Sequence, residues 1–169
     1  MSDHTHNAPG RTVVQRGLWF EEFEEGVTYQ HQPGRTVTEA DNTLFTTQTM
    51  NTQPLHLDAA WAAKQPGFRG ERLVNSMFTL STVVGLSVSQ LSLGTIVANL
   101  GFKEVSFPQP LFHGDTLYAE TTCVGKRPSR SRPNQGIVEL EHIGRNQHGD
   151  VVCLTVRSTL MQFRPAGEE

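Results

Sequence analysis

Thirty consecutive residues of this chain, from 73 to 102, contain no Asp, Glu, Lys or Arg. An uncharged segment of this length is long enough to cross a membrane as a helix. Small polar side chains interrupt it throughout, however; they are Asn75, Ser76, Ser81, Thr82, Ser87, Ser89, Gln90 and Ser92. We therefore expect the protein itself to enclose this segment, and we expect no association with a membrane.

The first part of the segment has the spacing of a helix. Apolar side chains recur at steps of three, four and seven residues, at Leu73, Met77, Leu80, Val84 and Leu91. The other faces hold small or apolar groups, and a helix without a charged face is surrounded by protein on most sides. The sequence predicts a buried central helix that ends before Gly94.

Four segments after this helix alternate between apolar and polar residues in the manner of β-strands. They cover residues 95–107, 115–126, 136–146 and 150–163. Short turns join them, which is typical of an antiparallel sheet. One long buried helix followed by such a sheet predicts an α+β fold, in which a curled sheet wraps around the helix.

Two of the turns contain the tripeptide His-Gly-Asp, at 113–115 and at 148–150. Gly and Asp directly before a strand are the ordinary residues of a turn. A His near an Asp is also a possible catalytic pair, and His113 is the better placed of the two. We interpret both tripeptides as turns.

The N-terminal third is predicted to contain less regular structure. Residues 27–38 look extended, and the aromatic and acidic run at 17–26 is either one helical turn or an extended segment that covers the core. Thr38 and Asp41 resemble a helix-capping pair at the start of a helix over 38–50, and residues 58–64 predict a further short helix. We expect a flexible polar tail at 1–16, one domain at 17–165 and a second tail at 166–169.

The net charge of −3 and the pI near 6.2 disfavour a nucleic-acid-binding surface. The one basic cluster is interpreted as a solvated loop rather than a phosphate site; it comprises Lys126, Arg127, Arg130 and Arg132. Cys123 and Cys153 form no CxxC pair, and no signal-peptide pattern begins the chain, so reduced thiols and a cytosolic location are expected. His4 and His6 lie in the polar tail, and no zinc-type ligand set is present, so no metal is predicted.

The segment MNTQPLHLD, residues 50–58, contains a proline, a lone histidine and two side-chain amides within nine residues. Together with FPQPLFHGDTLYAET at 107–121, it resembles the MaoC-like dehydratase family of the hotdog fold, which includes (R)-specific enoyl-CoA hydratases. The resemblance covers about residues 17–163. Within that family, residues 72–92, 99–110 and 126–141 are most similar to the branch that includes mesaconyl-CoA and itaconyl-CoA hydratases.

The resemblance implies an acyl-CoA thioester as substrate, with coenzyme A as part of it and no separate cofactor. It also implies a homodimer or an assembly of dimers. It places His56 in the family's position for the catalytic base, and a free imidazole titrates near pH ~6.5, which suits that task. The sequence departs from the family pattern at Asn51, which stands where the family has Asp, at Gln53 in place of Asn, and at Asn75–Ser76 in place of His-Gly.

Hydration of an enoyl thioester needs a base for the water and a site for the negative charge on the thioester oxygen. An amide cannot exchange protons at neutral pH but can hold a water, so Asn51 is expected to orient water for His56. Asp41 is an alternative acid, although we prefer its capping role. The start of the central helix, at Asn75, Ser76 and Met77, is expected to hold the thioester oxygen.

Three further residues are predicted substrate contacts. Gln53 lies in the loop that precedes His56, and Arg69 and Arg72 lie just before the central helix, where a cation would suit the distal carboxylate of a dicarboxylic acyl group.

Two other functions fit the same fold. An acyl-CoA thioesterase usually has a carboxylate on the central helix, and the absence of any acidic residue at 73–102 counts against it. A non-catalytic acyl-CoA-binding or assembly partner is supported by the replacement of the family's Asp by Asn51. An enoyl-CoA hydratase or dehydratase is the function that we expect.

Overall fold

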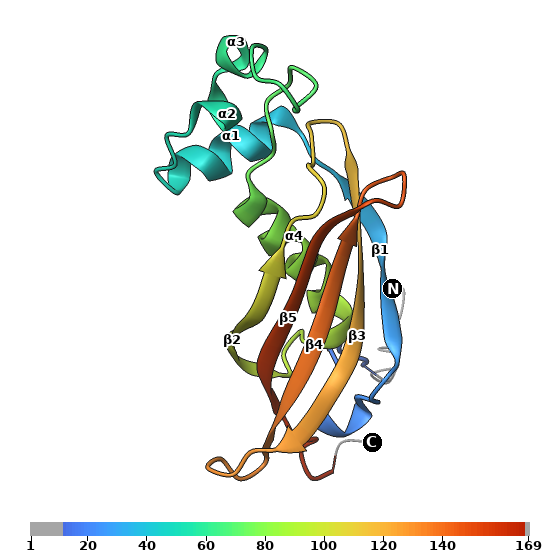
Figure 1. Ribbon diagram of the computed structural model, residues 1–169. Helices are drawn as coiled ribbons and strands as arrows, with labels where there is room; N and C mark the ends of the chain where they lie inside the picture. The colour runs from blue at the N-terminus through green and yellow to red at the C-terminus, as the bar shows by residue number, and fades with distance from the viewer. Residues whose placement is uncertain (1–11, 168–169) are drawn as a thin grey trace, which may run out of the picture.

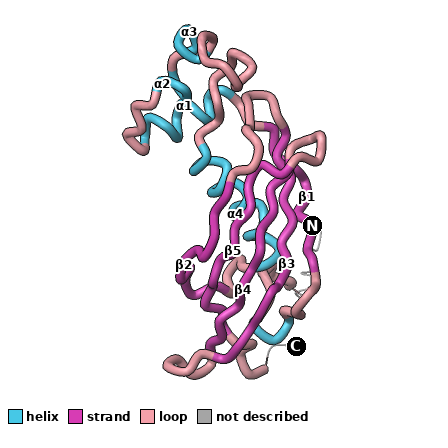
Figure 2. Tube along the Cα trace, viewed as in Figure 1, coloured by secondary structure: helices cyan, strands magenta, loops and turns pink. Residues whose placement is uncertain are grey.

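The computed structural model describes residues 12–167 and has the predicted α+β architecture. The elements, in chain order, are the 3₁₀-helix η1 (Phe20–Glu22), β1 (Thr28–Thr36), α1 (Glu39–Gln48), α2 (Pro54–Leu57), α3 (Ala59–Ala62), α4 (Ser76–Leu91), β2 (Ile96–Ser106), β3 (Thr116–Pro128), β4 (Gln135–Arg145) and β5 (Val151–Gln162). The sheet curves along α4, and α1, α2 and α3 lie together beyond one end of it (Figures 1 and 2). His4, His6, residues 1–11 of the predicted N-terminal tail and the last two residues of the C-terminal tail lie outside the described residues.

The five strands form one antiparallel sheet in the order β1-β3-β4-β5-β2. Short turns join β3, β4 and β5, whereas β2 crosses to the far edge and pairs with β5. At the first of the predicted His-Gly-Asp turns Gly114 has a φ of 89°, and at the second Gly149 has a φ of 86°. These left-handed conformations favour glycine, which confirms the interpretation of both tripeptides as turns.

The central helix begins at its predicted start, Asn75–Met77, although the apolar spacing also includes Leu73. Leu73 is extended and forms an isolated β-bridge with Phe112, so its assignment to the helix was wrong. Asn75 is the N-cap, and its side-chain oxygen accepts a hydrogen bond from the Met77 amide at 3.0 Å. Because this cap satisfies an amide that a helix start leaves open, α4 begins at Ser76.

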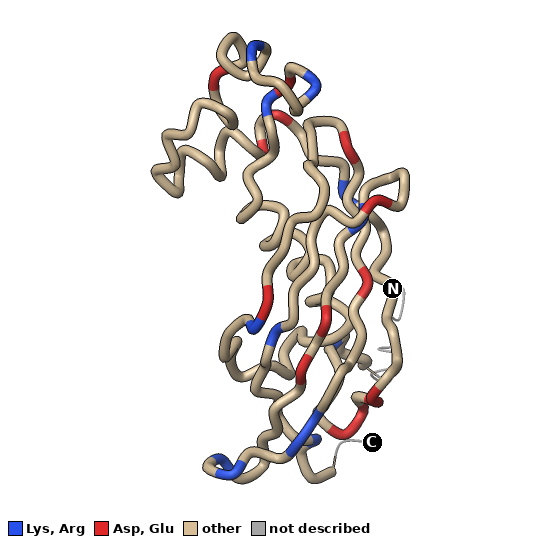
Figure 3. Tube along the Cα trace, viewed as in Figure 1, with Lys and Arg blue, Asp and Glu red and all other residues tan. Residues whose placement is uncertain are grey.

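No charged residue lies on α4, and Figure 3 shows the charges on the sheet, on the loops and around α1–α3 instead. No helix in the described part of the chain is long and apolar enough to cross a membrane. The predicted enclosure of α4 is incomplete in a single chain, however. One stripe of the helix is exposed, at Met77, Ser81, Gly85 and Ser89.

The fold places Lys126 and the three arginines of the basic cluster in different surroundings. Arg127, Arg130 and Arg132 are exposed at the β3–β4 hairpin, as expected of a solvated loop (Figure 3). Lys126 instead donates hydrogen bonds from Nζ to the carbonyl oxygens of Phe20, Glu21 and Phe23. It therefore fastens η1 to the sheet rather than offering a phosphate site.

Two apolar clusters fill the space between α4 and the sheet. The upper cluster comprises Val37, Val74, Phe78, Val83, Leu111, Leu117, Ala119, Val152 and Cys153. The lower cluster comprises Phe20, Phe23, Leu91, Cys123, Val138, Leu140 and Met161. On the inner face of β3, Ala119 belongs to the upper cluster and Cys123 to the lower one, with buried Thr121 between them.

Thr121 belongs to a buried polar layer that crosses four neighbouring strands. His31 Nδ1–H donates to Gln90 Oε1 at 2.8 Å, and His31 Nε2 accepts from the Thr121 hydroxyl at 2.7 Å. The same hydroxyl accepts from His142 Nδ1–H at 2.8 Å. Next along the sheet, Arg157 is only 4% exposed, and its Nε and Nη2 have no partner among the described residues.

Burial is the main cause that lowers the pKa of His142 to about 3, and the charge of Arg157 adds to it. The folded protein therefore keeps this imidazole neutral at pH values where the unfolded chain protonates it. Since the unfolded state binds more protons between pH ~6.5 and ~3, stability falls as the pH falls through this window. His31 has a lowered pKa for the same reason, and it acts in the same direction.

In the wild type, the unfolding free energy falls on acidification from pH ~6.5 towards ~3, and His142 contributes roughly 3–5 kcal/mol to this decrease. We predict that the decrease is smaller in His142→Gln. Urea unfolding at a series of pH values measures this slope. His148→Gln is the matched control, because His148 is exposed at a turn and should leave the slope unchanged. An equal slope in wild type and His142→Gln would contradict the prediction.

Candidate active site

The loop between α1 and α2 is ordered by Asn51. The Asn51 amide donates to the Thr46 carbonyl at 3.0 Å, and its side-chain oxygen accepts from the Gln53 amide at 3.0 Å. Gln53 is the N-cap of α2 and is exposed, and Pro54 occupies the first turn, where it needs no amide partner. Because Asn51 Oδ1 is engaged, only its Nδ2 is left to donate to a bound water.

His56 lies on α2 and is 9% exposed. Its Nδ1 is 2.9 Å from the Leu73 carbonyl oxygen, which can only accept, so Nδ1 carries the proton. Nε2 is then an acceptor, and it has no protein partner among the described residues. A histidine that is fixed in this tautomer by a backbone carbonyl and keeps an open Nε2 is arranged as a general base.

The start of α4 has two open amides, that is, backbone N–H groups without a partner among the described residues. They differ in part from those expected. The Met77 amide is taken by the Asn75 cap, and the Asn75 amide donates to Asn42 Oδ1 at 2.8 Å. Within the described residues, the amides of Ser76 and Phe78 have no partner. Of the three residues predicted to hold an oxyanion, Ser76 alone keeps a free amide, and the sequence reasoning missed Phe78.

A cavity of about 280 Å³ adjoins this helix start. Ser76 and Thr79 line it from α4, and the connection between β2 and β3 provides much of its wall. The remaining lining residues are Phe68, Leu73, Val74, Phe107, Pro108, Gln109, Pro110, Leu111 and Val152. His56 is not in the lining, but Leu73, whose carbonyl orients His56, is.

Asp41 is engaged in capping α1. Its carboxylate accepts from the Thr38 amide at 2.9 Å, its own amide donates to the Thr38 hydroxyl at 3.2 Å, and Arg35 pairs with it at 2.5 Å. The hydrogen bond from the Thr38 amide is the largest cause that lowers the pKa of Asp41. The capping role is confirmed.

The two arginines before α4 have different surroundings. Arg72 forms an ion pair with Glu39 of α1, so its charge is already compensated. Arg69 is exposed and stacks its guanidinium 4.9 Å from the centre of the Phe112 ring. Neither lines the cavity, although Phe68, the neighbour of Arg69, does. Arg69 is therefore the more available cation.

Sequence reasoning missed Asn42, which is 0% exposed on the inner side of α1. Its amide nitrogen faces the carbonyl oxygens of His56 and Leu73, and also His113 Nε2 at 2.9 Å. His113 thus takes part in the site as well as in its turn. The sequence did contain one indication of a buried polar role for Asn42, because Asn42 and Thr46 are polar residues four positions apart on one face of the predicted helix.

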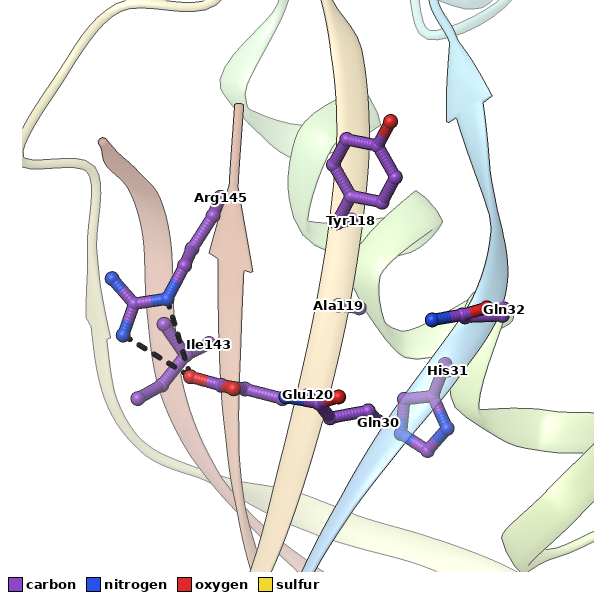
Figure 4. A pocket seen from close by; sticks show the side chains of 8 residues that line it. All are labelled: Gln30, His31, Gln32, Tyr118, Ala119, Glu120, Ile143 and Arg145. Carbon is purple, nitrogen blue, oxygen red and sulfur yellow. Dashed lines mark hydrogen bonds and ion pairs between the residues drawn. The ribbon is translucent and has the colours of Figure 1, made fainter. Parts of the chain in front are cut away.

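A second hollow, of about 200 Å³, lies on the sheet and is separate from this site (Figure 4). It is lined by Gln30, His31, Gln32, Tyr118, Ala119, Glu120, Ile143 and Arg145. Figure 4 shows Glu120 and Arg145 joined by an ion pair of 3.1 Å on neighbouring strands. None of the predicted site residues lines it.

No group of three or more His, Cys, Asp or Glu side chains in residues 12–167 could hold a metal ion.

Comparison with known proteins decides the family. Residues 22–146 match the family described as "MaoC like domain". The chain belongs to the MaoC-like family. This confirms the resemblance that was based on residues 50–58 and 107–121.

Two curated relatives of this MaoC-like chain are named as a hydratase and a dehydratase of CoA compounds. A mesaconyl-CoA hydratase of Haloarcula hispanica is 34% identical over 148 residues, which cover 87% of this chain and 40% of that protein. A beta-methylmalyl-CoA dehydratase of Chloroflexus aurantiacus is 30% identical over 148 residues, covering 88% of this chain and 41% of that protein. The chain therefore spans about two-fifths of the length of these relatives.

Solved structures place the MaoC-like chain in the hotdog fold. A MaoC-like dehydratase from Rhodospirillum rubrum has a TM-score of 0.77 and 30% identity, over 88% of this chain and 99% of that one. A Mycobacterium tuberculosis protein described as a double hotdog fold has a TM-score of 0.71 and 23% identity, over 90% of this chain and 46% of that one. The predicted hotdog fold is confirmed.

Proposed function

We propose that this protein is an enoyl-CoA hydratase or dehydratase, which adds water to the 2,3 double bond of an acyl-CoA thioester or removes it. One observation carries the proposal. A single buried side chain, Asn42, contacts the backbone of His56 at one end, at 3.3 Å, and the backbone of Asn75 at the other, at 2.8 Å. A base with an open Nε2 and a helix start with open amides therefore belong to one site.

In the hydration direction, His56 Nε2 takes a proton from water as the water oxygen bonds to the β-carbon. The electrons of the double bond move onto the thioester oxygen, which accepts hydrogen bonds from the Ser76 and Phe78 amides at the positive end of α4. The His56 imidazolium then returns the proton to the α-carbon. Dehydration is the same sequence in reverse.

Asn51 orients the water in this proposal and does not exchange a proton with it. Its Nδ2 donates to the water oxygen, while its Oδ1 holds the Gln53 amide. His56 alone therefore accepts and returns the proton. Gln53 remains a proposed substrate contact at the exposed N-cap of α2.

For the substrate, we propose a short branched or dicarboxylic enoyl-CoA of the mesaconyl- or itaconyl-CoA type. The names of the two relatives, the small apolar cavity beside Ser76 and the exposed Arg69 support this choice. Arg69 rather than Arg72 is proposed to meet a distal carboxylate, since Arg72 is paired with Glu39.

A non-catalytic acyl-CoA binder is the second candidate, favoured by Asn51 in place of the family's Asp. It keeps the cavity and the open amides of α4 but performs no chemistry. A thioesterase receives less support, because α4 carries no carboxylate that could activate water.

We further propose a homodimer, or an assembly of dimers, formed through β2. This edge strand pairs only with β5, and its exposed apolar side chains are Val97, Leu100, Phe102 and Val105. The exposed stripe of α4 also carries no charged residue. We propose that a second copy of the chain covers this stripe together with β2. A cytosolic location is part of the same proposal, and the two buried free thiols, Cys123 and Cys153, suit a reducing compartment.

Loss of enoyl-thioester absorbance tests the reaction. We predict turnover by the wild type and a loss of about 100-fold or more in His56→Ala, because general base catalysis contributes about 10²- to 10⁴-fold. His148→Ala, an exposed histidine, is the control and should retain full activity. Acyl-CoA binding without any turnover by the wild type would favour the binder.

The same assay tests the acyl group. We predict a higher kcat/KM for mesaconyl- or itaconyl-CoA than for crotonyl-CoA, which has no distal carboxylate. Arg69→Met should raise KM about 10-fold for the dicarboxylic substrates through loss of a charge-assisted bond, and leave crotonyl-CoA unaffected. Arg127→Met, at the exposed hairpin, is the control. An equal change for both substrates would remove Arg69 from this role.

Sedimentation analysis tests the dimer. We predict a dimeric wild type and a shift towards monomer in Leu100→Glu, which places a charge on the exposed edge strand. Val124→Glu adds the same charge at an exposed apolar position of the interior strand β3 and should remain dimeric. A monomeric wild type at micromolar concentration would contradict the proposal.

A further inference from the structure

Asn42 has more contacts than an ordinary buried amide. It lies on α1, 14 residues before His56, and its side chain reaches five groups from four parts of the chain. These groups are the carbonyl oxygens of His56 and Leu73, His113 Nε2, the Thr46 hydroxyl and the Asn75 amide. Such a fully buried amide is costly to remove, because each unpaired polar neighbour loses its partner.

The donor end of Asn42 acts on the base. Its Nδ2 is 3.3 Å from the His56 carbonyl and 3.2 Å from the Leu73 carbonyl. The Leu73 carbonyl also accepts from His56 Nδ1–H at 2.9 Å. Asn42 therefore fixes both the backbone of His56 and the oxygen that orients its ring.

The acceptor end of Asn42 acts on the helix start. Its Oδ1 accepts from the Asn75 amide at 2.8 Å. Asn75 in turn caps α4 and donates from its own side chain to the Thr46 hydroxyl at 3.3 Å. The open amides of Ser76 and Phe78 follow directly, so their direction depends on how Asn75 is held.

His113 keeps the donor end of Asn42 in this orientation. Its Nε2 lies 2.9 Å from Asn42 Nδ2, a contact that requires an unprotonated Nε2. Burial is the main cause that lowers the pKa of His113, and the charge of Arg72 lowers it further, against the opposing charges of Glu39 and Glu71. If the oxygen and nitrogen of the Asn42 amide were exchanged, the oxygen would face three other hydrogen-bond acceptors, namely the two carbonyl oxygens and His113 Nε2. The amide therefore has only one favourable orientation.

We propose that Asn42 is a positioning residue, which sets the His56 base and the open amides of α4 at a fixed separation. The inference rests on the proposed hydratase function and adds to it a residue that touches neither the substrate nor the reacting atoms. Its removal displaces the base relative to the oxyanion site, while the apolar cavity that binds the acyl group is left in place.

The test compares Asn42→Asp with the wild type. The carboxylate keeps the acceptor for the Asn75 amide but lacks the N–H groups that hold His56 and Leu73. We expect kcat to fall about 10- to 100-fold, because small misplacements of reacting groups cost that much, with KM changed less than about 3-fold. Asn42→Ser, whose short side chain cannot reach both the His56 and the Asn75 side of the network, should lower kcat at least as much.

Val138→Ala is the matched control for lost stability. Val138 is fully buried in the lower cluster and belongs to no part of this network. It should lower the unfolding temperature and leave kcat unchanged in the folded protein. If the Asn42 variants fold and keep the wild-type kcat, or lose activity only through KM, the positioning role is overturned.

Hydrogen exchange provides a readout that does not depend on activity. Asn42→Asp should speed amide exchange in residues 55–57, and Asn42→Ser should also speed it at 75–79, whereas Val138→Ala should do neither. A wild type without turnover overturns the proposed hydratase function. Unchanged exchange in both segments of the Asn42 variants overturns the positioning role itself.

Discussion

The buried amide of Asn42 is the interaction on which the candidate site depends. Helices α1, α2 and α3 lie beyond the end of the sheet (Figure 1), where Phe45 of α1 packs against the upper cluster and edge-on to Phe78 of α4. Polar contacts add to this apolar packing, and Asn42 reaches the backbone of His56, Leu73 and Asn75. The Asn75–Thr46 bond and the Arg72–Glu39 ion pair join the same parts of the chain. An amide is suited to this task because it donates in one direction and accepts in the other, so it can fix a base and a helix start simultaneously.

Fold stability and the candidate site have different physical origins in this chain. The two apolar clusters and the polar layer between them hold α4 against the sheet. That layer includes Arg157, two of whose nitrogens have no partner within residues 12–167, an arrangement that costs free energy in a single chain. The candidate site lies at the start of α4, next to the upper cluster and away from the lower one. Changes in the lower cluster should therefore alter stability without altering the geometry around His56.

Much of the fold was predictable, because its signals are local or periodic. The uncharged segment predicted α4, and the alternation of apolar and polar residues predicted the four later strands. The Thr38–Asp41 cap predicted the start of α1. His56 was predicted as a site residue from its loop motif. Leu73 was misassigned because an apolar residue in an extended bridge has the same spacing as one in the first turn of a helix.

The remainder of the site depends on contacts between distant segments, which periodicity does not encode. Asn42 meets residues 14, 31, 33 and 71 positions away, so its role cannot be read from its neighbours. The same is true of Arg72, whose partner Glu39 lies 33 residues away. The open amide of Phe78 was missed for another reason. The Asn75 cap uses the Met77 amide, and this becomes clear only when the cap geometry is known.

His56 presents an unprotonated Nε2 because the Leu73 carbonyl holds the proton on Nδ1. Imidazole ¹⁵N chemical shifts measure this directly, with the His56 signals assigned by their loss in His56→Gln. We predict that a single tautomer, protonated on Nδ1, dominates in the resting protein near neutral pH. A dominant tautomer with the proton on Nε2 would contradict it, since the base would then have no lone pair directed to the water.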